Sequence, residues 1–354
     1  MKTIREIDVF DKRILVRCDF NVSLDNKGNI LESFRIKETI PTINYLLKNK
    51  AKIILMSHLD DPGGMVIEKL RLTKIGEKLK NYLSAFSSGR PIPIIKADDC
   101  VGEIVKSLSQ KLKPREILLL ENLRFHPEEE ENNDVFAREL AKLGDLYVND
   151  AFGVCHRSHA SVVGVPKYLP KAIGFLLEKE LKILTELMEN PQKPLIAIIG
   201  GKKIETKIKL INRIAARADF LLINGLVKKE LQEKNIKLEY PQKIVAPLDS
   251  CAANLDIGPQ TIRLFREKIL QAKTVFWNGP LGKFEEEEFS KGTKSIAEAI
   301  IESKAFSIVG GGETVEAINK FGLGDQFNHL STGGGAMLAF LAGEMLPGLE
   351  ALRE

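Results

Sequence analysis

A strand-to-helix turn with three consecutive glycines stands near the end of the chain, in the stretch FSIVGGGETVEA (residues 306–317). An apolar run of strand length precedes the glycines, and a helical pattern begins at Val315. Such a turn leaves backbone N–H groups free of side chains, so they can surround phosphate oxygens at the positive end of a helix dipole. Glu313 directly follows the glycines and is placed to hold Mg²⁺ against the same phosphates.

Two further turns of this kind lie in the second half of the chain, IIGGKKIETK (198–207) and HLSTGGGA (329–336). One such turn could be purely structural, because a tight turn from strand to helix often needs glycine. Three of them favour a single phosphate site, with Lys203 and Lys207 as additional donors.

Polar residues follow the predicted strands of the first half in the same manner. They are Asp19 and Asn21, which flank Phe20, then His58, then Arg124, and finally His156, Arg157 and His159, while Arg35 opens a helix after a turn at residues 25–29. Each alone is typical of a solvated loop. Together they predict an anion pocket, because arginine grips phosphate and carboxylate through a planar fork. The four glutamates at 128–131 are expected to form a solvated helix start without a function.

Short apolar runs alternate with helical patterns along the whole chain. We expect strands at 13–17, 52–57, 116–120, 146–149, 195–199, 220–223, 243–246, 274–277 and 306–309, and helices at 36–48, 73–85, 134–143, 176–188, 206–217, 261–270 and 291–303. Continuous apolar strands that alternate with helices predict parallel sheets covered on both faces, with ligands beyond the carboxyl ends of the strands. The segment NPQKP (190–194) ends a helix and predicts a domain boundary.

Composition narrows the class of protein. The chain has 354 residues, 44% of them hydrophobic and 28% charged, with a net charge of +4. The length predicts about two domains, and the charge is too small and too spread for a nucleic-acid-binding face. No apolar run has the ~18 residues of a membrane span, and the charged N-terminus is unlike a signal peptide, so we expect a cytoplasmic protein. The four scattered cysteines indicate neither a zinc site nor a disulfide framework.

The two halves together suit phosphoryl transfer from a nucleotide to a small anion, since this chemistry needs mainly positioning and charge neutralisation. A carboxylate acceptor is already ionised at neutral pH, so no general base is required. The sequence has no Walker A motif, no catalytic Asp of a protein-kinase loop and no G-x-G-x-x-G after a strand. It therefore fits none of these common nucleotide-binding classes.

Nearly the whole chain resembles phosphoglycerate kinase. The motifs that carry the resemblance are VRCDFNVSL (16–24), MSHL (56–59), LLLENLRFHPEEE (118–130), VNDAFGVCHRSHAS (148–161), IIGGKKIETK (198–207), LDIGP (255–259), VFWNGPLGKFE (275–285), VGGGETV (309–315) and STGGGA (331–336). So many motifs in the family's order are far more specific than any single glycine turn.

The resemblance implies an α/β fold of two doubly wound parallel-sheet domains, joined by a helix at 173–190 and separated by a hinge-bending cleft. Residues 1–172 with about 345–354 would bind 3-phosphoglycerate, and 191–344 the nucleotide. The implied reaction is reversible and Mg²⁺-dependent: 1,3-bisphosphoglycerate and ADP give 3-phosphoglycerate and ATP. A monomer is expected.

The resemblance also assigns residues to roles. Substrate contacts fall on Asp19, Phe20, Asn21, Arg35, His58, Arg124 and Arg157. Nucleotide contacts fall on Lys203, Lys207, Asn278, Glu285, Gly310, Gly311, Gly312, Glu313 and Thr314, with Glu313 as the metal ligand. Arg35, Lys203, Gly311 and Gly334 would stabilise the transferred phosphoryl group.

Several positions depart from the family pattern. Asp60 and Asp61 follow SHL where Gly-Arg is usual, so weaker 3-phosphoglycerate binding is expected; Glu313 replaces an Asp, and Lys202 a small residue. The segment between Ile223 and Asp256, which normally walls the adenine, is short. Two alternatives therefore stay open: a catalytically weak relative with a binding or regulatory role, and a kinase for another small carboxylic acid.

Overall fold

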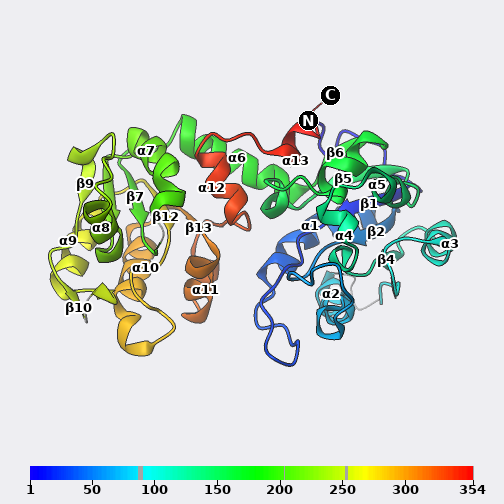
Figure 1. Ribbon diagram of the computed structural model, residues 1–354, viewed down its shortest axis with the longest axis horizontal. Coiled ribbons are helices and arrows are strands. Elements are labelled where there is room, and N and C mark those ends of the chain that lie inside the picture. The colour runs from blue at the N-terminus through cyan, green and yellow to red at the C-terminus, as the bar shows by residue number, and fades with distance from the viewer. Residues whose placement is uncertain (87–90, 203, 252–253, 354) are drawn as a thin grey trace. The chain divides into compact units, whose positions relative to one another are not determined.

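The computed structural model describes residues 1–86, 91–202, 204–251 and 254–353, and the chain divides into two compact units. Unit 1 comprises Met1–Leu181 and Met345–Glu354, and unit 2 comprises Lys182–Glu344. The division falls inside helix α6 (Phe175–Glu189), so the two units share the helix that the sequence analysis expects to link two domains. Figure 1 shows the elements of both units along the chain.

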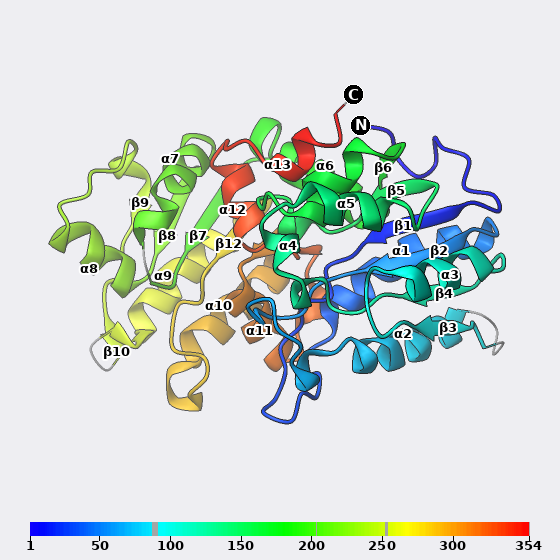
Figure 2. The same cartoon turned by 45° about the vertical axis from the view of Figure 1, so that its right-hand side comes forward.

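Unit 1 is built on a six-stranded sheet whose strands are all parallel, in the order β3-β4-β2-β1-β5-β6. Its strands are β1 (Arg13–Arg17), β2 (Lys52–Met56), β3 (Ile94–Lys96), β4 (Ile117–Leu119), β5 (Leu146–Asn149) and β6 (Lys171–Ile173); its helices are α1 (Phe34–Lys48), α2 (Thr73–Phe86), α3 (Glu103–Lys111), α4 (Pro127–Glu130), α5 (Asp134–Ala141) and α13 (Pro347–Glu350). Figure 2 shows β1, β2, β4 and β3 running beside one another in this order.

Unit 2 repeats the plan with a second all-parallel sheet, in the order β14-β13-β12-β7-β8-β9. Its strands are β7 (Leu195–Ile199), β8 (Phe220–Ile223), β9 (Ile244–Val245), β12 (Thr274–Asn278), β13 (Phe306–Gly310) and β14 (His329–Leu330), with a small antiparallel pair β10 (Ser250–Cys251) and β11 (Asp256–Ile257). Its helices are α7 (Ile208–Arg217), α8 (Gly225–Glu233), α9 (Pro259–Ile269), α10 (Lys291–Ser303), α11 (Gly312–Lys320) and α12 (Gly335–Leu341).

Both sheets are doubly wound. From β1 the chain passes to β2, then to β3 at the edge of the sheet, and returns to β4 between them; it then continues with β5 and β6 on the other side of β1. From β7 it steps to β8 and β9, and then to β12, β13 and β14. Each sheet therefore has a switch point, between β1 and β5 and between β7 and β12, and ligands of open α/β sheets bind at the carboxyl ends of strands at such points.

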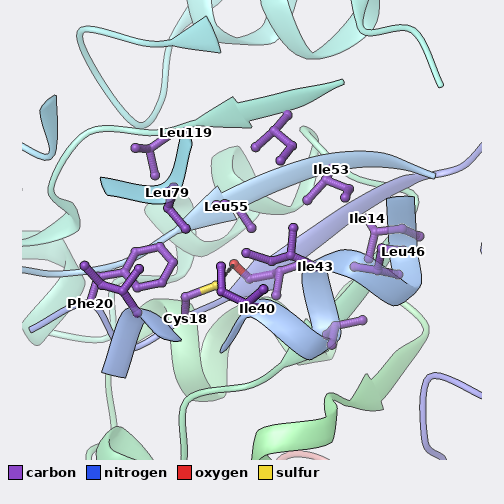
Figure 3. Packing of buried hydrophobic residues seen from close by; sticks show 14 of the residues in the cluster. Ile14, Cys18, Phe20, Ile40, Ile43, Leu46, Ile53, Leu55, Leu79 and Leu119 are labelled. Atoms are coloured by element: carbon purple, nitrogen blue, oxygen red, sulfur yellow. Dashed lines mark hydrogen bonds between the residues drawn. The ribbon is translucent and has the colours of Figure 1, made fainter. Parts of the chain in front are cut away.

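The core of unit 1 explains why its strands form. Ile14, Ile53 and Leu55 on neighbouring strands pack against Ile40 and Ile43 of α1, and all five side chains are buried (Figure 3). The helix residues are spaced three apart, which places them on one face of α1. Burying a side chain of this size contributes roughly 1.5–3 kcal/mol, so these contacts fix the strand register and with it the residues at the strand ends.

Most predicted strands and helices coincide with observed ones to within a residue or two. β3, β6, β10, β11, α3, α8 and α13 have no counterpart among the predicted elements; the four strands have only two or three residues, too few to show a periodic pattern. The turn predicted at 25–29 is confirmed: the Asp25 N–H donates to the Asn29 carbonyl at 2.9 Å, and Leu24 bridges Ile30. None of the helices in the described part of the chain is long and apolar enough to cross a membrane.

The C-terminal residues return to unit 1. The Gly348 N–H of α13 donates to the Cys155 carbonyl at 2.8 Å. A Cβ at Gly348 would lie 2.7 Å from a Val162 methyl and 2.9 Å from Cys155 Cα, so glycine permits this close approach.

Candidate functional site

The carboxyl ends of β1, β2, β4 and β5 lie together in unit 1, because these strands are neighbours in a parallel sheet. The sheet thereby brings together residues from four separate parts of the sequence. These residues are Asp19 and Asn21 after β1, His58 after β2, Arg124 after β4 and Ala151 after β5.

Asp19, Asn21 and Arg35 form the first cluster at this edge. Arg35 Nη1 donates to the Asn21 carbonyl at 2.7 Å and lies 3.3 Å from Asp19 Oδ2. Asp19 is buried, while the Arg35 side chain keeps about a quarter of its surface exposed. The contacts hold the guanidinium at the sheet edge and leave part of it free to meet a ligand.

The backbone of Asp60 connects this cluster to Arg124. The Asp60 N–H donates to Asn21 Oδ1 at 2.8 Å, and Arg124 Nη1 donates to the Asp60 carbonyl at 2.9 Å. Asp60 has a φ of 57°, in the left-handed region that favours glycine but admits Asp. A glycine would adopt this backbone conformation without strain. The carboxylates of Asp60 and Asp61 are both exposed.

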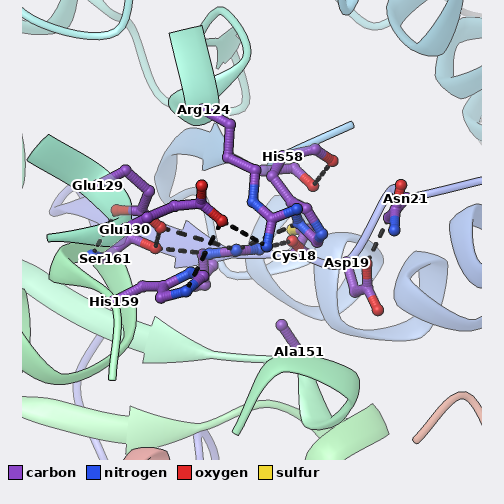
Figure 4. Close-up of polar contacts among 12 residues, drawn as sticks. Cys18, Asp19, Asn21, His58, Arg124, Glu129, Glu130, Ala151, His159 and Ser161 are labelled. Atoms are coloured by element: carbon purple, nitrogen blue, oxygen red, sulfur yellow. Dashed lines mark hydrogen bonds and ion pairs between the residues drawn. The ribbon is translucent and has the colours of Figure 1, made fainter. Parts of the chain in front are cut away.

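Arg124 lies on a 3₁₀ turn, Leu123–Phe125, whose start is fixed by the buried Asn122. The Asn122 side chain accepts the Arg124 N–H at 3.1 Å and donates to the Leu59 carbonyl at 2.8 Å. At its far end Arg124 Nη2 pairs with Glu130 at 3.1 Å, while its buried Nε has no hydrogen-bond partner in the described part of the chain. Figure 4 shows Arg124 extended between Glu130 and His58.

A buried arginine that the sequence analysis did not assign to the site lies at the same sheet edge. Arg17, fully buried at the end of β1, donates from Nε to Ser161 Oγ at 2.8 Å and places Nη2 3.3 Å from His58 Nδ1. A guanidinium nitrogen can only donate, so His58 accepts at Nδ1 and carries its proton on Nε2. Arg17 is a charged residue at the end of an apolar strand. Such a residue needs buried polar partners, and this pattern could have indicated that Arg17 belongs to the site.

The expectation that residues 128–131 form a solvated face is wrong for Glu129, while Glu130 and Glu131 are exposed as expected. Glu129 is fully buried, accepts both the Ser161 N–H at 2.8 Å and the Ser161 hydroxyl at 2.5 Å, and lies 4.0 Å from Arg17 Nη2. Burial raises its pKa, against the opposing charge of Arg17. Glu130 pairs with Arg124. Four consecutive glutamates are typical of a solvent-facing segment. Glu129 nevertheless points inward, because the buried Arg17 of a distant strand offsets its charge.

The two buried histidines of this pocket are held neutral. Burial, and then the charges of Arg17 and Arg124, lower the pKa of His58 well below its usual value. Burial and the same two arginines lower the pKa of His159 to about 4. Neutral histidines among arginines donate hydrogen bonds to an anion without adding charge of their own.

Phe20 and Arg157, two predicted substrate contacts, and the neighbouring His156 make none of the contacts described above. The Phe20 side chain is fully buried in the core and its N–H donates to Ser57 Oγ at 2.9 Å, so its ring faces no ligand. Arg157 is exposed on the loop after β5. His156, next to it, is half-buried with an Nδ1 that has no partner among the described residues, and burial lowers its pKa.

In unit 2 the carboxyl ends of β7, β12, β13 and β14 are joined by backbone contacts. The Gly200 N–H donates to the Asn278 carbonyl at 2.9 Å, Asn278 Nδ2 donates to the Gly310 carbonyl at 3.0 Å, and the Gly279 N–H donates to Thr314 Oγ1 at 2.8 Å. Thr314 is fully buried, so its hydroxyl braces the loop after β12. Asn278 and Thr314 thus lie within one hydrogen-bonded edge.

The glycines of this edge serve different purposes. A Cβ at Gly279 would lie 2.2 Å from the Gly200 carbonyl oxygen, and one at Gly310 would overlap Met337 Sδ, so both permit close packing. Gly311 and Gly334 have φ of 94° and 48°, which L-residues with side chains rarely adopt. Gly312, the first residue of α11, faces open space, because a Cβ there would meet no described atom within 4 Å. Its amide belongs to the N-terminal turn of a nine-residue helix.

The charged residues predicted for the nucleotide lie around this edge. Lys207 donates to the Gly200 carbonyl at 3.0 Å; burial lowers its pKa, and the charges of Glu313 and Glu230 oppose that shift. Glu313 is exposed in the first turn of α11, and Glu285 is exposed on the loop that follows Phe284. Lys203 lies outside the described residues.

Comparison with known proteins decides the family. The phosphoglycerate kinase family model matches residues 4–240 and 227–344, which together span most of the chain. The chain belongs to the phosphoglycerate kinase family. It is therefore a phosphotransferase.

Individual members of the phosphoglycerate kinase family align over their full length. The enzyme of Pelotomaculum thermopropionicum is 40% identical, covering 99% of this chain and 98% of the relative, and that of Moorella thermoacetica is 42% identical, covering 99% of each. Two solved phosphoglycerate kinases share the fold over 99% of this chain and 98% of theirs. That of Coxiella burnetii has a TM-score of 0.79 at 32% identity, and that of Pyrococcus horikoshii OT3 has 0.85 at 31%.

The matches also show that this member of the phosphoglycerate kinase family is short. The alignment with the Pelotomaculum enzyme runs over 395 positions, whereas this chain has 354 residues, so at least 41 positions have no counterpart here. The family model matches in two segments that overlap at residues 227–240, after the end of β8. Here α8 begins at Gly225, with Asn224 capping it by accepting the Val227 N–H at 2.9 Å.

Proposed function

We propose that the chain transfers a phosphoryl group reversibly between 1,3-bisphosphoglycerate and ADP, giving 3-phosphoglycerate and ATP. Residues 1–172 with 345–354 would form the 3-phosphoglycerate-binding domain, residues 191–344 the nucleotide-binding domain and 173–190 the helix between them. The observation that carries the proposal is the division of chemistry: unit 1 gathers arginines and neutral histidines at one sheet edge, and unit 2 presents bare amides at another. We further propose a cytoplasmic monomer.

In unit 1 the substrate would be held by charge-assisted hydrogen bonds. Arg35, Arg124 and Arg157, with His58 donating from Nε2, would bind the phosphate and carboxylate of the substrate, and Asp19 and Asn21 would fix its orientation. Such contacts to an anion are worth about 1.5–3 kcal/mol each. Phe20 would contribute backbone only, since its side chain is buried.

In unit 2 the nucleotide phosphates would lie over the amides of Gly310, Gly311 and Gly312 and beside Lys203 and Lys207, with Asn278, Thr314 and Glu285 completing the contacts. Glu313 fits a hard divalent cation, because it is an exposed carboxylate at the start of α11 beside the same glycines. When bound there, Mg²⁺ would neutralise phosphate charge.

For the transfer step, an oxygen of the 3-phosphoglycerate carboxylate forms a bond to the γ-phosphorus of ATP as the bond from that phosphorus to the β-phosphate oxygen breaks. ADP leaves with the electron pair of that bond. Arg35, Lys203 and the amides of Gly311 and Gly334 would stabilise the charge on the moving group. Closure of a hinge would bring these groups together and exclude water.

The proposal is tested by a coupled assay with 3-phosphoglycerate, ATP and Mg²⁺, comparing Glu313→Gln with Glu316→Gln, an exposed glutamate one turn along α11. We expect turnover at ordinary kinase rates, and a Mg²⁺ requirement raised at least about tenfold by Glu313→Gln alone. Nucleotide binding without turnover would contradict the proposal and favour a binding or regulatory relative.

A second candidate is a kinase for another small carboxylic acid. It is favoured by the exposed carboxylates of Asp60 and Asp61, which border the pocket where Arg124 meets the Asp60 carbonyl. Negative charge there selects against a phosphorylated acid and for a less anionic one. The same assay with a panel of unphosphorylated hydroxy acids distinguishes the two: turnover with one of them well above that with 3-phosphoglycerate would establish this candidate.

A further inference from the structure

Three side chains of different chemistry converge in unit 1 outside the pocket described above. Asp99 and Cys100 lie on the loop between β3 and α3, and His126 lies between the 3₁₀ turn that carries Arg124 and helix α4. One ligand atom from each, a carboxylate oxygen, a thiol sulfur and an imidazole nitrogen, all lie within 4.8 Å of one another. No spacing motif in the sequence connects Cys100 to His126, so only the fold brings them together.

The positions of these atoms are fixed by contacts of their own. The Cys100 N–H donates to Asp99 Oδ1 at 2.6 Å, and the same oxygen lies 2.7 Å from His126 Nε2. Cys100 is fully buried. The His126 ring stacks on Phe136 with centroids 5.3 Å apart, which holds the ring plane. Nε2 therefore faces the carboxylate and the thiol.

The other nitrogen of His126 points to a second carboxylate. Nδ1 lies 4.0 Å from Glu128 Oε2, and that oxygen is buried without a hydrogen-bond partner in the described ranges of the chain. A carboxylate beside the nitrogen that does not bind metal is the usual companion of a metal-ligating histidine, since it sets the tautomer and raises the basicity of the ring.

We propose that Asp99, Cys100 and His126 bind a zinc-type transition ion, with Glu128 orienting the histidine and a water in the fourth position. Thiolate, imidazole and carboxylate are ligands for Zn²⁺ and neighbouring transition metals, whereas Mg²⁺ prefers oxygen ligands alone. The site is therefore separate in chemistry from the Mg²⁺ site proposed at Glu313 in unit 2.

The three ligands must shift to accept the ion. Bonds of about 2.0–2.1 Å in a tetrahedral site separate oxygen and nitrogen ligands by about 3.3 Å. Asp99 and His126 would part by about half an ångström, and the sulfur would approach. The Asp99 side chain is half-exposed, which gives an ion a path from solvent and leaves room for the water.

Binding releases protons. The thiol S–H bond breaks, the sulfur electron pair forms the bond to the metal, and the proton leaves to solvent. The proton that His126 Nε2 donates to Asp99 also leaves that nitrogen, whose electron pair then binds the metal, and the ring keeps a proton on Nδ1, on the side of Glu128. Burial and the charges of Asp99 and Glu129 raise the pKa of the Cys100 thiol, so the thiol keeps its proton until a cation arrives. The same negative charges attract a cation.

The test uses Co²⁺ as a probe, because a bound thiolate gives it a charge-transfer absorption and tetrahedral geometry strengthens its visible bands. We expect one Co²⁺ per chain, displaced by one Zn²⁺. Cys100→Ser should abolish the charge-transfer band, and His126→Gln and Asp99→Asn should weaken binding at least about tenfold. Cys251→Ser, which removes the exposed cysteine of β10, is the matched control and should leave the band unchanged.

Absence of a stoichiometric thiolate band, or a band lost in Cys251→Ser and kept in Cys100→Ser, would overturn the proposal and leave a simple Asp99–His126 ion pair. If Cys100→Ser fails to give a native circular dichroism spectrum, the Co²⁺ affinity of His126→Gln tests the proposal instead. Wild-type Co²⁺ affinity in folded His126→Gln protein would equally refute the site.

Discussion

Both sheets of this protein are doubly wound, with different strand orders, and they present different chemistry at their carboxyl edges. In unit 1 the edge carries charged side chains, and each is held by others behind it: Arg17 by Ser161, Arg124 by Glu130, Arg35 by Asp19. In unit 2 the edge carries backbone amides exposed by glycines. An anion can thus be bound by buried charged side chains that need partners of opposite charge, or by backbone amides that need glycine to remain uncovered. Substitutions should therefore disrupt the two edges in different ways.

A large steric effect is expected in unit 2. In Gly279→Ala the new Cβ would meet the Gly200 carbonyl oxygen at 2.2 Å and would require a φ of 93°. Overpacking against backbone together with a left-handed conformation costs about 3 kcal/mol or more, so we expect this loss of unfolding free energy in urea denaturation. Gly312→Ala, in open space, should cost well under 1 kcal/mol. Equal stability of the two variants would contradict the close-packed backbone described for unit 2.

A second prediction concerns pH and compares buried carboxyls of the two units. Asp150 in unit 1 accepts the N–H groups of Leu176 and Leu177 at the start of α6, and burial raises its pKa to about 7. Asp256 in unit 2 accepts the Gly292 N–H at 2.7 Å, and burial raises its pKa to about 6. Because folding favours the protonated form of each group, each contributes stability that is present at low pH and is lost as pH rises toward its folded-state pKa.

For Asp150 that loss occurs between about pH 4 and 7 and amounts to roughly 4 kcal/mol as an order of magnitude. Asp150→Asn should therefore flatten the dependence of unfolding free energy on pH across this window, and Asp256→Asn should flatten it less and only up to about pH 6. A steeper fall of stability in Asp150→Asn than in the parent chain would contradict the sign of this linkage.

The smallest predicted effect concerns the charge of Asp61 at the unit 1 edge. Asp61 is exposed and directly follows Asp60, whose carbonyl accepts from Arg124, at a position where the sequence analysis expects an arginine. An exposed charge near a phosphate is worth about 1 kcal/mol, so reversing its sign in Asp61→Arg should lower the KM for 3-phosphoglycerate several-fold and leave that for ATP unchanged. Glu77→Arg, an exposed reversal on α2, is the control. An unchanged KM for 3-phosphoglycerate in Asp61→Arg would mean that the charge of Asp61 does not affect substrate binding.

The sequence predicts the unit 2 edge more fully than the unit 1 edge. Glycine turns at 310–312 and 333–335 are visible because glycine itself signals the backbone conformation. At the unit 1 edge, strand position predicts Arg124 and His58 but gives no sign that Glu129 turns inward, since its partners Arg17 and Ser161 come from distant parts of the chain. The cluster of Asp99, Cys100 and His126 is invisible for the same reason. Short strands such as β3 leave too few residues for a pattern.

Calorimetric titration of two variants with both ligands tests most directly whether the edges bind different substrates. Arg124→Met should weaken 3-phosphoglycerate binding about 10- to 100-fold, the loss of a charge-assisted contact, and leave Mg-ADP affinity unchanged. Gly312→Ala, whose side chain enters the space assigned to phosphate, should weaken Mg-ADP binding and spare 3-phosphoglycerate. If either variant weakens both ligands equally while remaining folded, the two edges do not act as separate half-sites and the account fails.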